Sequence, residues 1–328
     1  IGGMQILHME HDDPYEKTLP KIGQFVIEIF LIYLFLTLIC AIFYFIAGMS
    51  SFDSLAHAMT TIATGGFSTH DDSFGSFNSA NIEWISVIFM IIGSLPFVVY
   101  LKIMHGNWKI FFKDDQIKLF FILIIVTIGI TTAWLLLNSS EKSLYLLRIS
   151  TFNVTSILTG TGYSSSNYNS WGGFGLVIMF IIMFIGGCAG STTGGVKIFR
   201  LQILFGSVKS QIKKLNQPHG VFVTSFNQKT VSEDTFNSVM NFFFIYILIF
   251  IIASLLLSFL GLDFLTAISA SASAISNVGP GLGDTIGPSG NYNSLPMQAK
   301  WILSITMLVG RLEIFTFLVL LSVSFWKS

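Results

Sequence analysis

Three short glycine-rich turns contain the residues of this chain that are best suited to chemistry. The first turn is Thr64-Gly65-Gly66-Phe67-Ser68, the second is Gly160-Thr161-Gly162-Tyr163-Ser164, and the third is Asn277-Val278-Gly279-Pro280-Gly281. Glycine adopts left-handed backbone at little cost, so such turns can aim their carbonyl oxygens inward. Carbonyl oxygens replace the water around a cation without titrating. These residue types therefore predict cation coordination by main-chain oxygens.

The three turns are in register with one another. A shift of 96 residues aligns Gly66 with Gly162, and a further shift of 117 aligns Gly162 with Gly279. A single turn of this kind is most simply a tight loop, but three in register indicate three copies of one supersecondary unit. The predicted ion-binding residues are Thr64, Gly65, Gly66, Gly160, Thr161, Gly162, Asn277, Val278 and Gly279.

A second glycine-rich stretch, Gly186 to Gly195, lies inside an apolar segment, and five of its ten residues are glycine. Each glycine costs a helix about 1 kcal/mol relative to alanine, so we expect the helix to break or become mobile there. The predicted gate residues are Gly190, Ser191, Thr192, Thr193, Gly194 and Gly195. The alternative is close helix packing through small residues. A phosphate-binding loop is disfavoured because the Gly-Lys-Ser/Thr ending is missing.

Arg311 is an ionisable residue within the last apolar segment. Such residues usually face a cavity or a partner and are functional by default. We interpret Arg311 as a further gate residue, which projects below the turns and opposes cations. The alternative is a structural pair with a carboxylate elsewhere. No Ser/His/Asp, zinc or dinucleotide pattern occurs, so the sequence predicts neither an enzyme nor a cofactor.

The composition is that of a membrane protein. Of the 328 residues, 52% are hydrophobic and 10% are charged, whereas soluble domains contain about 25% charged residues. The formal net charge is zero, which disfavours a nucleic-acid partner. Cys40 and Cys188 both lie in apolar segments, so we expect buried thiols and no disulfide.

Six apolar stretches approach the roughly 20 residues that a membrane-crossing helix needs. They are 25–48, 82–101, 118–137, 173–205 with an interruption, 239–260 and 300–323. Three shorter segments, 52–63, 143–159 and 263–276, rise about 15–20 Å as helices and cannot cross; we call them half-helices. The predicted fold is an all-α polytopic membrane protein with three repeats of helix, re-entrant half-helix, filter loop and helix.

Charge predicts the orientation. The segments rich in lysine and arginine, 102–118 and 197–229, are expected to be cytoplasmic. The connections with the turns carry Asp53, Asp71, Asp72, Glu83, Asp263 and Asp284 and are expected outside, where negative charge attracts cations. The predicted boundaries are a linker 1–22, a repeat 23–104, a connection 105–117, a repeat 118–205 with its gating loop at 186–196, a connection 206–236 and a repeat 237–328.

These motifs resemble the superfamily of potassium transporters that includes Trk, Ktr and HKT proteins, and most closely its bacterial TrkH branch. The similar segments are A-T-G-G-F-S-T from Ala63, L-T-G-T-G-Y from Leu158, S-N-V-G-P-G from Ser276, G-G-C-A-G-S-T-T-G-G-V-K from Gly186 and G-R-L-E-I-F from Gly310. Together they extend over essentially the whole chain and are highly specific.

The resemblance implies a potassium-channel-like pore of four repeats with one filter glycine each, in a homodimer in the inner membrane of a bacterium. It implies that 190–195 is an intramembrane gating loop with Arg311 beneath the filter. It also implies K+ as the ion, contact with membrane lipids, and a cytoplasmic nucleotide-binding regulatory subunit of the TrkA type. The chain opens at Ile1 without an initiator Met, and we expect a preceding first repeat. Preference for K+ over Na+ depends partly on that repeat, and Rb+ is expected to be bound or conducted as K+ is.

The leading hypothesis is K+ uptake through a carbonyl filter gated by an intramembrane loop. One alternative is an ion-coupled secondary symporter that moves K+ with H+ or Na+, because broken helices at the membrane midplane also form solute sites. That alternative predicts inverted repeats and intramembrane carboxylates, whereas these repeats are parallel. A further alternative is a channel-like subunit of a larger pump, or a non-conducting membrane scaffold.

Overall fold

The computed structural model describes residues 22–220, 222–227, 229–312, 319 and 325–326. Nearly all of the predicted linker 1–22 and most of the last predicted span beyond Leu312 lie outside the described residues, as does the end of the G-R-L-E-I-F motif.

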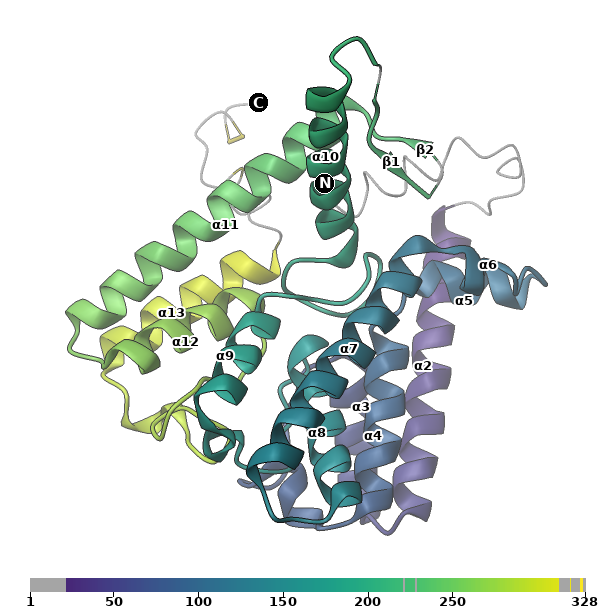
Figure 1. Ribbon diagram of the computed structural model, residues 1–328. Coiled ribbons are helices and arrows are strands. Elements are labelled where there is room, and N and C mark those ends of the chain that lie inside the picture. The colour runs from purple at the N-terminus through teal and green to yellow at the C-terminus, as the bar shows by residue number, and fades with distance from the viewer. Residues whose placement is uncertain (1–21, 221, 228, 313–318, 320–324, 327–328) are drawn as a thin grey trace.

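Helices dominate the chain in three consecutive sets, as predicted (Figure 1). The first set comprises α2 (Ile22–Ile46), α3 (Ser51–Ile62), η2 (Ser73–Phe77), α4 (Ala80–Gly93), α5 (Phe97–Met104) and α6 (Ile110–Lys113). The second comprises α7 (Asp115–Asn138), α8 (Ser143–Leu158), η3 (Tyr168–Trp171), α9 (Gly172–Met183) and α10 (Ile198–Asn216). The third comprises α11 (Glu233–Phe259), α12 (Phe264–Ser276), η4 (Tyr292–Ser294) and α13 (Met297–Arg311).

The helices α2, α7 and α11 are each long and apolar enough to cross a membrane. The predicted continuous span 82–101 is wrong, because α4 and α5 are bent by 87° at the break between them. Pro96 causes the break: it has no N–H to donate, and it disfavours helical backbone at the residue before it. The predicted interruption of the fourth span is confirmed, since α9 ends at Met183 and α10 begins at Ile198.

The three predicted half-helices are the helices α3, α8 and α12, each within one residue of the expected bounds. Ser50 caps α3 by accepting a hydrogen bond from the Asp53 N–H at 3.1 Å. Asp263 caps α12 in the same way, with the Thr266 N–H at 3.1 Å. These caps satisfy N–H groups that a helix start leaves without a partner. Each half-helix ends directly before one of the three turns.

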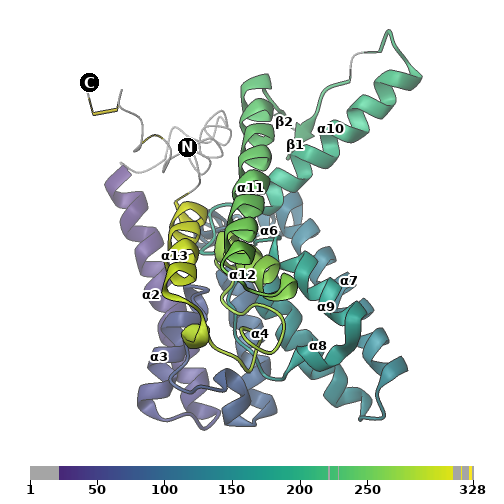
Figure 2. The same cartoon turned by 90° about the vertical axis from the view of Figure 1, so that its left-hand side faces the viewer.

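Contacts between the sets place the repeats side by side. The helix α4 packs against α8, and α9 packs against α12, so the apolar helix that follows the turn of one repeat contacts the half-helix of the next. Figures 1 and 2 show α10 at one end of the molecule and the connections from α2 to α3 and from α7 to α8 at the other. The first two turns therefore follow half-helices that enter from the end opposite the basic helix α10.

Three local features differ from the expected organisation. The strands β1 (Ser225–Phe226) and β2 (Lys229–Thr230) form a small antiparallel pair that the all-helical prediction did not include. The helix α10 continues past the boundary expected at 205, and α7 begins three residues before the boundary expected at 118. Both cysteines are buried and free, as expected.

Candidate functional site

Each of the three turns has left-handed backbone at two matching positions. The φ angles are +48° at Thr64 and +70° at Gly66, +68° at Gly160 and +85° at Gly162, and +57° at Asn277 and +114° at Gly279. The residue between each pair, at 65, 161 or 278, is not left-handed. Carbonyls alternate in direction along an ordinary extended strand, and a left-handed residue at every second position reverses this alternation. The backbone thus has the form that a carbonyl-lined site requires.

Thr64 and Asn277 adopt this conformation without being glycine. Asparagine tolerates left-handed backbone, but for a β-branched residue it is strained. The Thr64 hydroxyl donates to the Ala63 carbonyl at 2.8 Å and lies 3.2 Å from the Thr192 hydroxyl, which helps to hold the strained residue. Backbone strain of this kind concentrates at functional sites. Both residues are among the predicted filter residues, although residue type alone predicts left-handed backbone only at the glycines.

The turns pack against one another in chain order. A methyl group on Gly66 would overlap the carbonyl oxygen of Thr161, and one on Gly162 would overlap that of Val278. Residues 65, 161 and 278 are register equivalents, so the second and third turns present the same carbonyl to the turn before them. At Gly279 the nearest described atom to such a methyl group would be Gly162 Cα, 4.0 Å away. The three predicted filter turns are therefore brought together, the first against the second and the second against the third.

A hydroxyl on the last turn of each half-helix holds the turn that follows it. The hydroxyls of Thr60 and Ser156 donate to the carbonyls of Phe67 and Tyr163 at 2.9 and 2.7 Å. The Ser273 hydroxyl instead accepts from the Gly279 N–H at 3.0 Å. Our sequence reasoning missed these residues. The signal was present, because 60, 156 and 273 have the same spacing of 96 and 117 as the glycines.

Tyr163 fastens the second turn to the first repeat. Its side chain is fully buried. Its hydroxyl lies 2.6 Å from the Thr60 hydroxyl and 3.2 Å from that of Thr61, and it donates to the His57 carbonyl at 3.2 Å. A buried hydroxyl with several partners fixes its ring strongly, because each lost partner would leave a buried polar group unsatisfied.

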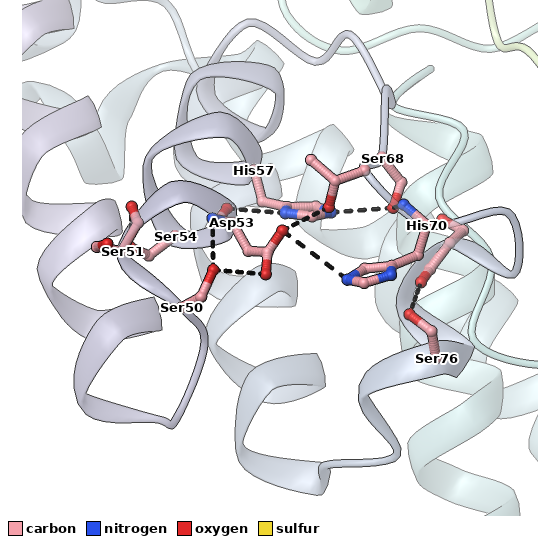
Figure 3. A network of polar contacts seen from close by, with 10 residues as sticks. Ser50, Ser51, Asp53, Ser54, His57, Ser68, His70 and Ser76 are labelled. Carbon is pink, nitrogen blue, oxygen red and sulfur yellow. Dashed lines mark hydrogen bonds and ion pairs between the residues drawn. The ribbon is translucent and has the colours of Figure 1, made fainter.

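A polar network surrounds the segment that follows the first turn (Figure 3). His57 Nδ1 lies 2.8 Å from the Asp53 carbonyl, which can only accept, so this nitrogen carries the proton. In the neutral ring, His57 Nε2 therefore accepts from the Ser68 hydroxyl at 3.0 Å. The Asp53 carboxylate accepts from Ser50 at 2.6 Å and from Thr69 at 2.7 Å. The network joins the outgoing segment to the half-helix α3.

Two acidic residues, Asp53 in the first turn of α3 and Asp263 at the cap of α12, keep negative charge at the outer ends of these half-helices. Hydrogen bonds from Ser50 and Thr69 hold the pKa of the Asp53 carboxyl below its ordinary value. Hydrogen bonds from Thr266 do the same for the pKa of Asp263. Both carboxyls are therefore ionised at neutral pH, and their field favours the approach of cations.

A buried ion pair joins the first two repeats. Arg148 Nε on α8 lies 3.3 Å from Glu83 Oε2 on α4, and the exposed fractions of the two side chains are 22% and 6%. Removing one partner of a buried pair leaves an uncompensated charge, so the pair holds these helices in a fixed relation. The sequence analysis counted Glu83 only among the charges outside.

The glycine-rich stretch forms an ordered crossing below the turns. The Thr192 hydroxyl lies 2.9 Å from the Ile62 carbonyl at the end of α3 and 3.0 Å from the Gly93 carbonyl at the end of α4. The Gly190 carbonyl accepts from the Phe97 N–H at 3.0 Å. The expected helix break is thus present, and its backbone is hydrogen-bonded to the first repeat.

The stretch also contacts the third repeat and Arg311. A methyl group on Gly194 would lie 2.6 Å from the Ser276 carbonyl at the end of α12. A cavity of about 220 Å³ is lined by residues 191–195 together with Lys197, Arg200, Phe242, Gly310 and Arg311. Arg200, which our sequence reasoning did not single out, lies over the Phe242 ring at 3.8 Å. All predicted gate residues except Gly190 therefore line one cavity.

Comparison with known proteins identifies the family. The model of the TrkH family, described as cation transport protein, matches residues 2–327. The chain is 42% identical to the Trk system potassium uptake protein TrkI of Halomonas elongata over 329 residues, covering all of this chain and 67% of that protein. It is 36% identical to TrkH of Vibrio parahaemolyticus over 334 residues, covering all of this chain and 68% of that protein.

A solved structure has the same fold. The crystal structure of the potassium transporter TrkH from Vibrio parahaemolyticus aligns with a TM-score of 0.88 at 34% sequence identity. The alignment covers 95% of this chain and 67% of the crystallised one. The chain therefore belongs to the TrkH family of cation transport proteins and shares their polytopic membrane fold.

Proposed function

We propose that the chain is part of a pore that takes up K+ across the cytoplasmic membrane of a bacterium. The observation that carries this proposal is the set of three turns with left-handed residues at matching positions, each packed against the next in chain order. The names of its relatives support K+ as the ion, because those relatives are named Trk system potassium uptake proteins.

In this proposal the turns replace the water around a K+ ion. The carbonyls of residues 64–66, 160–162 and 277–279 line the path, and they supply oxygen ligands that do not titrate. The half-helices α3, α8 and α12 end at the turns, so the partial negative charge of each C-terminus favours a cation there. Ionised Asp53 and Asp263 attract cations to the outer mouth.

We assign the gate to residues 190–195 and Arg311. The loop lies between the ends of two half-helices, because Thr192 contacts the Ile62 carbonyl and Gly194 lies against Ser276. Arg311 lines the same cavity as residues 191–195, where its charge opposes a cation that leaves the filter. Conduction in this scheme requires the loop to release its hydrogen bonds to Ile62 and Gly93.

The family resemblance adds three further parts to the proposal. The protein forms a homodimer, contacts membrane lipids, and binds a nucleotide-binding regulatory subunit of the TrkA type. The helix α10 ends in Lys213 and Lys214 and lies at the end opposite the outer connections, which suits a cytoplasmic docking surface (Figure 1).

Ion flux into liposomes tests the proposed function. Vesicles that contain the full-length protein should take up K+ and Rb+ faster than protein-free vesicles under a K+ gradient alone. Uptake no faster than in empty vesicles would reject the pore. Uptake that requires an H+ or Na+ gradient, and stops when the gradient is collapsed, would favour the symporter.

Two variants test the gate in the same vesicles. Shortening the loop at 190–195 and replacing Arg311 with alanine should each raise K+ leak. For Arg311→Ala we expect about ten- to thirtyfold, the factor for a unit charge roughly 8 Å from the ion at an effective dielectric constant of about 20. Lys142→Ala is the control, because it removes an exposed cation at the start of α8 that does not line the cavity. Unchanged leak in well-folded Arg311→Ala would give Arg311 a structural role.

A further inference from the structure

The third turn lacks the support that an aromatic residue gives to the second. Positions 67, 163 and 280 are register equivalents and hold Phe, Tyr and Pro. Tyr163 reaches α3, the half-helix of the preceding repeat, through its hydroxyl, which lies 2.6 Å from the Thr60 hydroxyl. Pro280 has no polar group on its side chain to do the same. Another residue must therefore hold this turn.

Tyr292 supplies the missing contact from the outer loop. Its hydroxyl donates to the Gly279 carbonyl at 2.7 Å, from a position thirteen residues further along the chain. The Gly279 N–H donates to the Ser273 hydroxyl at 3.0 Å. Both polar groups of this filter glycine are thus held by side chains. In the described part of the chain, no hydrogen bond of this kind reaches the carbonyl of Gly66 or Gly162.

The position and the proton of Tyr292 are both secured. Tyr292 opens the short helix η4, which Asn291 caps by accepting from the Asn293 N–H at 3.0 Å. Lys300 on α13 donates to the Asn293 carbonyl at 2.8 Å, so η4 is attached to the last long helix. Burial raises the pKa of Tyr292 to about 12. The phenol therefore keeps its proton at neutral pH and remains a donor.

We propose that Tyr292 is a positioning residue that sets the preference of the third turn for K+ over Na+. Na+ is smaller than K+ and is bound well only if the surrounding carbonyls move closer to it. The bond from Tyr292 restrains the Gly279 carbonyl from moving, so a bound Na+ is penalised more than K+. This inference rests on the proposed function, because it assumes that residues 277–279 line the ion path.

Replacing Tyr292 with phenylalanine tests the inference, because it removes only the hydroxyl. The assay is 86Rb+ uptake by vesicles with the full-length protein, measured against increasing K+ and increasing Na+. We expect Na+ to compete about two- to tenfold better relative to K+, the factor that corresponds to the net value of one neutral hydrogen bond. The maximal rate should change little, since the turn keeps its contact through Ser273.

Tyr100→Phe is the matched control. The Tyr100 hydroxyl also donates to a backbone carbonyl, that of Ile92 at 2.6 Å, which is not part of any of the three turns. Both variants should lose similar thermal stability, and only Tyr292→Phe should change the competition between K+ and Na+. Unchanged competition in Tyr292→Phe, or an equal change in Tyr100→Phe, would overturn the inference. Failure of the wild-type protein to take up Rb+ would instead reject the proposed function.

Discussion

The second and third turns share one register but are supported in different ways. In the second turn, Gly162 lies against the Val278 carbonyl and the buried Tyr163 reaches back to α3. In the third turn, Gly279 is held by the hydroxyls of Ser273 and Tyr292. The second turn thus depends on its neighbours in the ring, and the third depends on its own half-helix and outer loop. Equal spacing in the sequence therefore does not imply equal tolerance to substitution.

Alanine at the two filter glycines should separate these modes of support, with the largest effect of all the substitutions considered. In Gly162→Ala the new methyl group overlaps the Val278 carbonyl and lies 3.0 Å from Pro280 Cδ, so we expect K+ uptake to be lost. In Gly279→Ala the nearest atom among the described residues is 4.0 Å away, so within this part of the protein only the φ of +114° is unfavourable. The strain is about 1–3 kcal/mol, so part of the uptake should remain. The rate of 86Rb+ uptake, compared between the two variants at equal expression, measures both effects.

Gly48→Ala is the control for backbone strain alone. Gly48 has a φ of +105° with open space around it, and it lies between α2 and α3, outside the turns. The Gly48→Ala variant should lose about as much stability as the Gly279→Ala variant and should keep normal K+ uptake. If Gly162→Ala and Gly279→Ala were equally inactive, a carbonyl from a preceding repeat would face Gly279 as the Val278 carbonyl faces Gly162, and the difference between the two turns would be lost.

The periodic features of this fold could be predicted from the sequence. The half-helices, the break after Met183 and the meeting of the three turns all follow from apolar length, glycine content and repeat register. The register also contained the hydroxyls of Thr60, Ser156 and Ser273, although our reasoning did not use it for them. Such features depend on local backbone preference, and the residue types of a single sequence are enough to indicate that preference.

Contacts between distant segments could not be predicted in this way. The bond from Tyr292 to Gly279 has no counterpart in the other repeats, so the register does not indicate it. The pairing of Glu83 with Arg148 depends on how α4 packs against α8, because both residues look like separate surface charges in the sequence. Thr64 adopts a backbone that its own residue type disfavours, since the surrounding structure imposes it.

The smallest effects that we expect come from the half-helix hydroxyls. Ser156→Ala removes the donor to the Tyr163 carbonyl, at 2.7 Å, and should cost about 1 kcal/mol of stability with little change in ion competition. The turn keeps its position because the Tyr163 hydroxyl still contacts Thr60 at 2.6 Å.

Ser273→Ala leaves the Gly279 N–H without its partner and should weaken discrimination against Na+ about two- to tenfold.

A double-mutant cycle turns this difference into a measurement of coupling. Ser273 and Tyr292 hold the N–H and the carbonyl of one residue, so their effects on Na+ competition should be non-additive. Ser156 and Tyr292 act on different turns, so the same cycle with Ser156→Ala should be additive within about 0.5 kcal/mol. Equal coupling in the two cycles would mean that the filter responds as one rigid ring. Coupling confined to Ser273 would mean that each turn is adjusted by its own supports.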